Sequence, residues 1–276
     1  MSGSASRVVV KPVVGSGSVG VRLCVDGVDV KTAVAAVLDV ELAVPNAPRP
    51  TTALVEGYLD GPEFSVETFD DRVVGVTAKH LGPAPYFVET GHDFPAPLTP
   101  GDEAAIGDVA VYALRALGLG WGAAHTEVRL TSSGPRIVEI NPRLAGGMIP
   151  QMVAEATGVD LIACVVARAA RRAVSPQATR HRAASIRFVM ADRSGVLTAI
   201  HGVARAERCP GVVGVGVVGV VGEHLEIRRS FRDRIAYVIT VADDGESAAT
   251  AADVGARMIA VEIVPNPADL GAVRRE

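Results

Sequence analysis

Two glutamates near the middle of the chain are spaced so that a tight turn could bring them face to face. The residues on either side of positions 132–134 have the composition of strands, and Ser-Ser-Gly between them is typical of a turn. If Thr131 pairs with Pro135 across that turn, Glu127 lies directly opposite Glu139. Opposed Cβ atoms in an antiparallel pair are about 4.5 to 5.5 Å apart, so the two carboxylates repel unless a cation lies between them.

The same strand face carries further polar groups. Because strand side chains alternate between two faces, Asn141 and then Arg143 follow Glu139 on its side. Two carboxylates and an amide oxygen form the hard ligand set that Mg²⁺ takes when phosphate oxygens complete its shell. The alternative is a solvated strand face with coincidental acids, and a one-residue slip in register would remove the pairing.

A glycine-rich segment, GSGSVGV from Gly15 to Val21, could supply contacts to those phosphates. Its glycines leave backbone N–H groups unobstructed, and Lys11 on the entering strand adds a point charge. The segment lacks the Gly-Lys-Ser/Thr ending of a Walker A loop, and it leads into a strand instead of the helix that a Rossmann fingerprint opens. A plain hairpin with a glycine tip is the alternative.

These residues need strands and helices to position them. Val8 to Pro12 predicts a strand that forms a hairpin with a second strand ending near Val25. Helical periodicity is present from Lys31 to Leu42, before a proline-rich loop at Pro45 to Pro50, and again from Asp102 to Leu117. Further strands are predicted at Thr52 to Leu59, Glu63 to Phe69, Val73 to Lys79, His125 to Leu130 and Ile137 to Asn141.

The second half of the chain has a different pattern. A long helix is predicted to begin near Pro150 and to break or bend at Gly158. The Arg-rich stretch from Arg171 to Arg182 indicates a boundary, after which strands with glycine turns and one helix around Ala248 to Ile259 are expected. The apolar, glycine-interrupted segment 211–222 is interpreted as a core strand with tight turns.

Composition limits the class of protein. A chain of 276 residues that is 49% hydrophobic can bury a large core in one or two globular units. With 27 Lys+Arg against 31 Asp+Glu, the net charge of −4 gives no general attraction to nucleic acid or to an anionic membrane. Three widely separated cysteines argue against a disulfide framework, and no apolar stretch resembles a signal peptide or a membrane span, so a cytoplasmic protein is expected.

Taken together, the motifs resemble those of the ATP-grasp superfamily, specifically its carboxylate-amine ligases of the L-amino acid ligase type. The resemblance runs from Val8 to Leu161 and rests on VVVKP, GSGSVGV, TALVEGYLDGPEFSVE, GVTAKH, YFVETGHDFPAP, GAAHTEVRLTSSGPRIVEINPRLAGG and ATGVDL. It implies an α+β, ATP-grasp fold with a glycine-loop subdomain and a catalytic antiparallel-sheet subdomain, followed by a C-terminal α+β domain. The expected divisions are 1–57, 58–175 and 176–276.

The resemblance also implies roles for individual residues. Nucleotide contacts are implied for Lys11, Gly15, Ser16, Gly17, Ser18, Val19, Gly20, Glu56, Gly57, Leu59, Glu63 and Lys79, with the adenine near Glu56 to Leu59 and the ribose near Glu63. Magnesium ligation is implied for Glu127, Glu139 and Asn141, stabilisation of an acyl phosphate for Arg143, and a place in the substrate site for His92. A buried structural histidine is the alternative for His92, and His125 has no implied role.

The implied activity is ATP-dependent ligation of a small-molecule carboxylate, with an amino acid as the expected substrate, to an amine through an acyl phosphate. The implied cofactors are ATP and Mg²⁺, as two ions, with Mn²⁺ as an alternative metal. One alternative is a nucleotide-binding or partner-dependent subunit of a split ATP-grasp enzyme, without turnover of its own. Carboxylation of the biotin carboxylase type is the second alternative.

The sequence departs from these ligases at its start. They carry an upstream α/β domain, whereas only seven residues precede Val8 here. A truncated chain, a split enzyme and a shortened protein that has lost activity are the competing explanations. The departure predicts an unpaired sheet edge at Val8 to Val10, which favours a second chain supplying the missing domain, or a swapped homodimer. Nucleic acid and membranes are not expected partners.

Overall fold

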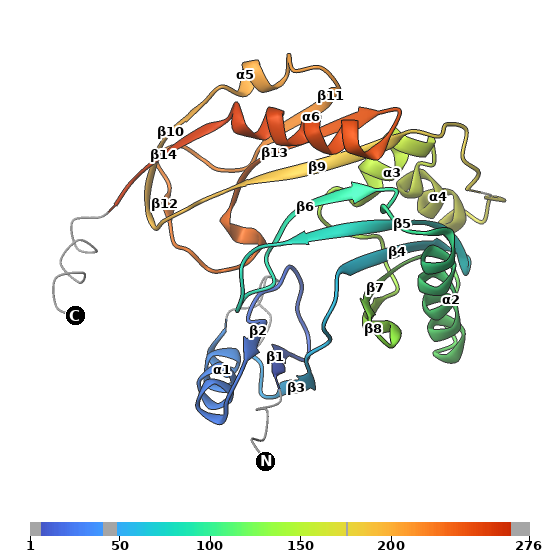
Figure 1. The fold of residues 1–276 in the computed structure, drawn as a ribbon, viewed down its shortest axis with the longest axis horizontal. Helices are drawn as coiled ribbons and strands as arrows, with labels where there is room; N and C mark the ends of the chain where they lie inside the picture. Colours follow the sequence, from blue (N-terminus) through green and yellow to red (C-terminus); the bar gives the residue numbers. More distant parts are fainter. Residues whose placement is uncertain (1–6, 41–48, 175, 266–276) are drawn as a thin grey trace.

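The glycine-rich hairpin predicted near the amino terminus is present in the computed structural model, which describes residues 7–40, 49–174 and 176–265 (Figure 1). Strand β1 (Val8–Pro12) pairs on one side with β2 (Arg22–Cys24) and on the other with β3 (Ala53–Gly57). The predicted unpaired edge at Val8 to Val10 is therefore wrong, because β1 is the central strand of a three-stranded sheet. Strand β3 of the same chain pairs with the backbone groups of β1 that were expected to be free for a second chain.

Helix α1 (Gly27–Asp39) packs on this small sheet and begins before its predicted start at Lys31. The reason is Asp26, whose side chain accepts hydrogen bonds from two N–H groups of the first turn and so caps the helix. The predicted helix end at Leu42 and most of the loop predicted at Pro45 to Pro50 lie outside the described residues.

The main body is one antiparallel sheet of eight strands, in the order β11-β13-β9-β6-β5-β4-β7-β8. The strands are β4 (Glu63–Phe69), β5 (Arg72–Leu81), β6 (Glu89–Phe94), β7 (Ala123–Thr131), β8 (Gly134–Asn141), β9 (Ala183–Met190), β11 (Val212–Val217) and β13 (Arg234–Ala242). β4 has the predicted bounds, whereas β6 was not predicted at all. In this order β6 lies between β5 and β9, so it joins the strands before residue 142 to the strands of the C-terminal part.

The two faces of β4, β5 and β7 differ in chemistry. One face packs under α2 (Pro100–Ala116), through a cluster that includes Val66, Val76 and Ile106 (Figure 1). Because strand side chains alternate, the opposite face carries the residues between these, among them Lys79 and Glu127. The polar face is thus held in place by the apolar face beneath it.

The long helix predicted near Pro150 is two helices, α3 (Ile149–Thr157) and α4 (Leu161–Ala169). They meet at 103°, and Gly158 at the break has a φ of +79°, which confirms the predicted bend. Within the described ranges no single helix is long and apolar enough to span a membrane, and α3 with α4 reaches that composition only as a bent pair.

The C-terminal part contributes β9, β11 and β13 to the large sheet and builds a second sheet of three strands. Its strands are β10 (Gly195–His201), β12 (His224–Leu225) and β14 (Ala260–Val264), in the order β12-β10-β14. The remaining elements are α5 (Val203–Ala206), the 3-10 turn η1 (Phe231–Asp233) and α6 (Gly245–Arg257). Helix α6 packs on β9 and β13 and begins before the predicted Ala248, because Asp244 caps it. The large sheet crosses the expected boundary at 176, so the three-part division remains a prediction.

The segment 211–222 is not the core strand that was predicted. Its first half forms β11, which lies at the edge of the large sheet, and several of its valines are exposed. The glycines between these valines provide no side chains to pack, so apolar composition alone did not indicate burial.

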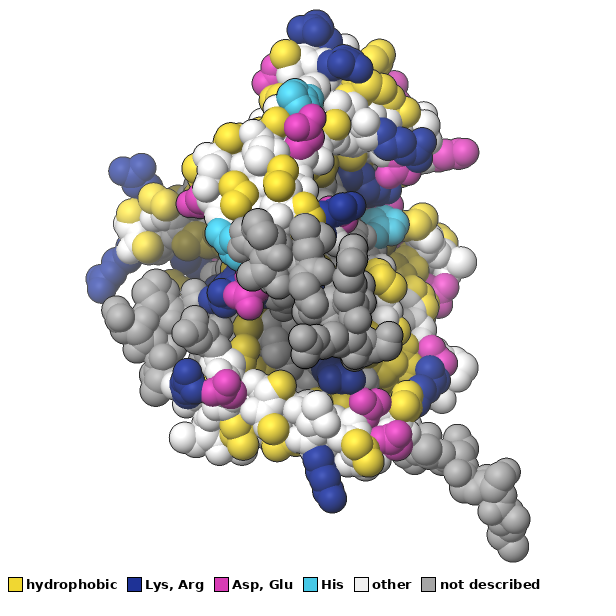
Figure 2. All heavy atoms as spheres, turned by 90° about the vertical axis from the view of Figure 1, so that its left-hand side faces the viewer, with side chains coloured by type: hydrophobic (Ala, Val, Ile, Leu, Met, Phe, Trp, Pro, Cys, Tyr) yellow, Lys and Arg dark blue, Asp and Glu magenta, His cyan; other side chains and the backbone are white. Residues whose placement is uncertain are grey.

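Charged side chains of both signs are interspersed over the face of the molecule drawn in Figure 2. Lys and Arg alternate there with Asp and Glu among the described residues, in line with the small net charge. This face therefore carries no continuous basic area of the kind that binds nucleic acid.

Candidate active site

The turn between β7 and β8 is tighter than predicted. Thr131 pairs with Gly134 and Leu130 with Pro135, so the expected pairing of Thr131 with Pro135 is wrong by one residue. If this register continued along the hairpin, Glu139 would lie opposite Thr126. Its side chain would then point to the face of the sheet away from Glu127.

A β-bulge restores the predicted pair. The register shifts between Glu127 and Val128, with the result that Glu127 faces Glu139 across the hairpin. Val138 is the extra residue of the bulge, and its carbonyl oxygen accepts a hydrogen bond of 3.5 Å from Lys11 Nζ. The bulge therefore has two effects. It places Glu127 and Glu139 opposite each other, and it directs the carbonyl group of Val138 toward Lys11 of β1.

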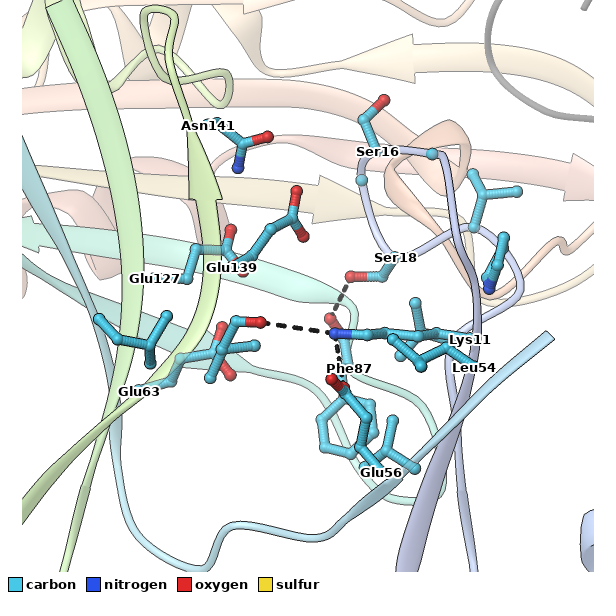
Figure 3. A pocket seen from close by; sticks show the side chains of 18 of the residues that line it. Lys11, Ser16, Ser18, Leu54, Glu56, Glu63, Phe87, Glu127, Glu139 and Asn141 are labelled. Carbon is cyan, nitrogen blue, oxygen red and sulfur yellow. Dashed lines mark hydrogen bonds and ion pairs between the residues drawn. The ribbon is translucent and has the colours of Figure 1, made fainter. Parts of the chain in front are cut away.

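These groups line a cavity of about 620 Å³ between the small sheet and the β7–β8 hairpin. Figure 3 shows Glu127, Glu139 and Asn141 on one side of it, with Lys11 and the serines of the glycine loop on the other. Every residue assigned a site role from the sequence lines this cavity except Gly20 and His92. Gly20, with a φ of +75°, instead lies against the Pro12 ring.

Lys11 is held by charge from the neighbouring strand. Its ammonium lies 2.6 Å from Glu56 Oε2, and both side chains line the cavity (Figure 3). One serine of the loop, Ser18, donates a hydrogen bond of 2.6 Å to the carbonyl oxygen of Phe87. The loop and the lysine are thus positioned before any ligand arrives.

Lys79 lies at the centre of an acidic cluster. Its Nζ is 2.6 Å from Glu89, 2.7 Å from Glu127 and 3.0 Å from Glu63, and its side chain is 2% exposed. Burial favours the neutral amine, but the three carboxylates outweigh it and raise the pKa of Lys79 well above its ordinary value. Glu63, expected near a ribose, is therefore already engaged in an ion pair.

Glu89 is the residue of this cluster that the sequence did not identify. Burial and the nearby Glu127 carboxylate raise the pKa of its carboxyl, yet the positive charge of Lys79 leads the opposing effects, and the pKa falls to about 2. Arg234 donates to Glu89 from β13, at 3.2 Å. Glu89 was missed because the polar sequence of β6 lacks the apolar alternation that predicts a strand. The one indication in the sequence was that Glu89 directly precedes the motif TGHDFPAP, which contains His92.

His92 is fully buried and does not line the cavity. Its Nε2 lies 3.5 Å from Glu89 Oε2, and its ring meets Phe188 edge-on at 5.6 Å between centroids. Burial, which disfavours the charged imidazolium, lowers the pKa of His92 to about 3. The place in the substrate site implied by the resemblance remains a prediction, while the geometry is that of a buried neutral histidine.

This depressed pKa predicts acid sensitivity. His92 stays neutral in the folded protein but titrates at about 6.5 when unfolded, so the unfolded state takes up the proton first as the pH falls. The free energy of unfolding should drop by up to about 1.4 kcal/mol per pH unit between 6.5 and about 3. His92→Gln should flatten this part of a urea-unfolding profile; parallel profiles for both proteins would contradict the expectation.

His125 connects two glutamates beneath the cavity. Its Nδ1 is 2.7 Å from Glu67 and its Nε2 is 3.3 Å from Glu127. Burial opposes its protonation, but the two carboxylates raise the pKa of His125 to about 10, so both ring nitrogens donate. The sequence offered no role for this residue; the structure places it under the glutamate expected to bind metal.

Arg129 ties the segment after β3 to the sheet. Its Nη1 donates to the carbonyl oxygens of Leu59 at 3.0 Å and Gly61 at 3.4 Å, while its Nε donates to Glu63 at 3.0 Å. The guanidinium also lies over the Tyr58 ring, 5.4 Å from its centroid. This buried residue was missed because its partners come from a segment far away in the sequence.

The predicted metal ligands, Glu127, Glu139 and Asn141, form only part of the shell that Mg²⁺ needs. In the described part of the chain, no three His, Cys, Asp or Glu side chains gather in a way that could hold an ion. Glu127 and Glu139 nevertheless face each other with Asn141 beside them, which is a partial oxygen set that phosphate oxygens would complete. One oxygen of Glu127 is bound by Lys79 and His125. The three side chains therefore fit Mg²⁺ as a partial ligand set, to which phosphate oxygens would add the remaining ligands.

Comparisons with known proteins identify the family and the fold of the chain. Residues 4–151 match the family described as ATP-grasp domain, and residues 187–264 match the L-amino acid ligase C-terminal domain 2. An uncharacterized protein y4rH of Sinorhizobium fredii is 40% identical over 242 residues, covering 88% of this chain and 50% of that protein. Mouse carnosine synthase 1 is 32% identical over 166 residues, or 56% of this chain and 20% of that protein. The chain spans half or less of these curated relatives.

Solved structures share the fold. The L-amino acid ligase from Bacillus licheniformis has a TM-score of 0.79 at 23% identity, over 94% of this chain and 64% of that one. The biotin carboxylase domain of Hydrogenobacter thermophilus 2-oxoglutarate carboxylase, solved with MgADP and bicarbonate, has a TM-score of 0.68 at 17% identity, over 95% and 58%.

Proposed function

Because the chain belongs to the ATP-grasp domain family and has its mixed α+β fold, as the sequence predicted, we propose that it is an ATP-dependent carboxylate-amine ligase with an amino acid as one substrate. The observation that carries the proposal is the cavity in which Glu127 and Glu139 face Lys11 and the glycine loop. Similarity to L-amino acid ligase and carnosine synthase supports this choice of reaction over other ATP-grasp activities.

The proposed reaction has two steps. The substrate carboxylate attacks the γ-phosphorus of ATP, the bond to the bridging oxygen breaks, and ADP leaves. The amine then attacks the acyl carbon, phosphate leaves with the bonding electrons, and the amine loses a proton to give an amide. Such phosphoryl transfer depends mainly on positioning and on charge neutralisation.

Each part of the cavity suits one of these tasks. The backbone of the glycine loop would hold the phosphates, with Lys11 as a fixed positive charge beside them. Glu127, Glu139 and Asn141 would hold Mg²⁺, which supplies further neutralisation of phosphate charge. Arg143, exposed at the rim and donating to the carbonyl oxygen of Leu144 at 2.9 Å, would turn inward to steady the acyl phosphate.

The test measures ADP release by the full chain with ATP, MgCl₂ and pairs drawn from a panel of amino acids. ADP release that requires both members of a pair, with the amide detected by mass spectrometry, is the expected result. Release with ATP and bicarbonate alone would support carboxylation instead. Absence of release by the chain alone and with any co-purifying protein would reject the ligase proposal; release only with the protein would indicate the partner-dependent alternative.

Arg129→Lys is expected to raise the KM for ATP about tenfold with little change in kcat. Lysine keeps the charge but cannot reach Glu63 and the carbonyls of Leu59 and Gly61 together, so the adenine-binding segment loses its anchor. Arg136→Lys, its exposed cross-strand neighbour, is the control. A fall in kcat with unchanged KM would contradict this role.

A further inference from the structure

The glycine loop rests on a residue from the far end of the chain. The N–H group of Phe231, in η1, donates a hydrogen bond of 3.1 Å to the carbonyl oxygen of Gly17. A Cβ atom built on Gly17 would lie 2.2 Å from Cδ1 of the Phe231 ring. The ring therefore occupies the space that any side chain at position 17 would need.

This contact gives Gly17 a second reason to be glycine. A φ of +64° already favours glycine at this position. The structure adds the ring of Phe231, which packs directly against the Cα of Gly17. The side chain is thus absent to admit an aromatic ring, and not only to expose N–H groups to phosphate.

Hydrogen bonds of its own side chains brace the turn that carries Phe231. Ser230 and Asp233 form a reciprocal capping box around it, and both side chains are buried. Asp233 also accepts a hydrogen bond of 2.8 Å from the N–H group of Arg228. The aromatic ring therefore contacts the loop from a turn that is held by its own hydrogen bonds.

The same turn leads directly to the acidic cluster. One residue after η1, Arg234 begins β13, lies 3.6 Å from the centroid of the Phe188 ring and donates to Glu89. Glu89 in turn binds Lys79, which binds Glu127. A short C-terminal segment thus touches both sides of the cavity: the loop through Phe231 and the cluster through Arg234.

We propose that Phe231 is a positioning residue that holds the glycine loop over the cavity, so that the C-terminal part of the chain sets the affinity of this site for nucleotide. The effect on nucleotide rests on the proposed function, in which the loop binds phosphates. The attachment of the loop itself rests only on the contacts between Phe231 and Gly17.

Hydrogen exchange of the full chain without nucleotide tests the attachment. Phe231→Ala should speed exchange in peptides that cover residues 13–21, because the loop loses its apolar support, while Phe231→Leu should restore most of the protection. Tyr112→Ala removes an exposed aromatic ring from α2, distant from the loop, and is the matched control. Unchanged exchange in Phe231→Ala would overturn the proposal.

A double-mutant cycle tests the assigned pair. Calorimetric titration with the non-hydrolysable analogue AMP-PNP and Mg²⁺ should give affinities about tenfold weaker for Phe231→Ala and for Gly17→Ala. The double variant should also be about tenfold weaker, and not a hundredfold, because a loop already detached has nothing further to lose. If the double variant bound AMP-PNP about a hundredfold more weakly, the two residues would act independently, and the proposal would be overturned.

The two measurements separate this inference from the proposed function. If the wild-type chain binds no AMP-PNP, the nucleotide role fails, and the exchange data alone decide whether Phe231 holds the loop. If Phe231→Ala speeds exchange but leaves nucleotide affinity unchanged, the control of affinity by the C-terminal part is overturned. Urea unfolding of each variant shows whether a loss reflects the loop or the whole fold.

Discussion

Replacing Glu139 by Gln is expected to lower nucleotide turnover by about 10²- to 10³-fold, the range found when a preorganised electrostatic group is removed from an active site. The carboxylate faces Glu127 across the hairpin, and the amide has nearly the same shape but no charge. Steady-state ADP release at saturating ATP and MgCl₂ measures the loss.

The fold should survive this substitution. Glu139 is exposed, and within the described residues no hydrogen bond or ion pair joins it to another side chain. Removing one of two facing anions also relieves repulsion in the ligand-free protein. The melting temperature should therefore be no lower than that of the wild type, and Glu103→Gln, an exposed acid on α2, serves as control. Normal turnover by Glu139→Gln would reject the metal assignment.

Replacing Lys79 by Met is expected to cost about 3 to 5 kcal/mol of folding free energy, the usual penalty for leaving buried charge without its partner. Met fills the space of the lysine stem but leaves Glu63, Glu89 and Glu127 facing one another without the ammonium. Urea unfolding at pH 7 measures the difference, and Lys31→Met on the exposed side of α1 is the control.

The pH dependence gives this prediction a sign. The lowered pKa of Glu89, about 2 in the folded protein, stabilises the fold above the unfolded value of 4.5, and that stability disappears as the pH falls toward 2. Lys79→Met lacks the ammonium that makes the largest contribution to this lowering. The stability gap between variant and wild type should therefore narrow below pH 4.5; a gap that is absent at pH 7, or constant with pH, would contradict the proposed cluster.

Local signals in the sequence predicted several elements well. The bounds of β1 and β4 are those expected, and the helix break at Gly158 is present. These features depend on neighbours in the chain: alternating side chains, turn residues and a glycine able to adopt positive φ. Helix starts were less accurate, because the caps Asp26 and Asp244 begin α1 and α6 ahead of the first residues with apolar periodicity.

Predictions that depended on pairing between distant strands were less reliable. The expected free edge at Val8 to Val10 was wrong because β3 covers it, and β6 was missed because its polar residues form a strand only between β5 and β9. The pairing of Glu127 with Glu139 was predicted from a turn that is one residue too long. The bulge at Val138, which sequence spacing does not reveal, corrects that error.

The sequence by itself determined which chemical groups the site would contain: a glycine loop, a lysine before it, and acids with an amide on one hairpin. Only the tertiary structure decided that Lys79 gathers three carboxylates from three different strands, and that Phe231 fills the space left by Gly17. The physical reason is that both arrangements depend on desolvation and close approach between segments far apart in the chain. Strand pairing creates these conditions around Lys79, and the packing of η1 against the glycine loop creates them around Gly17. No local pattern of residues encodes either arrangement.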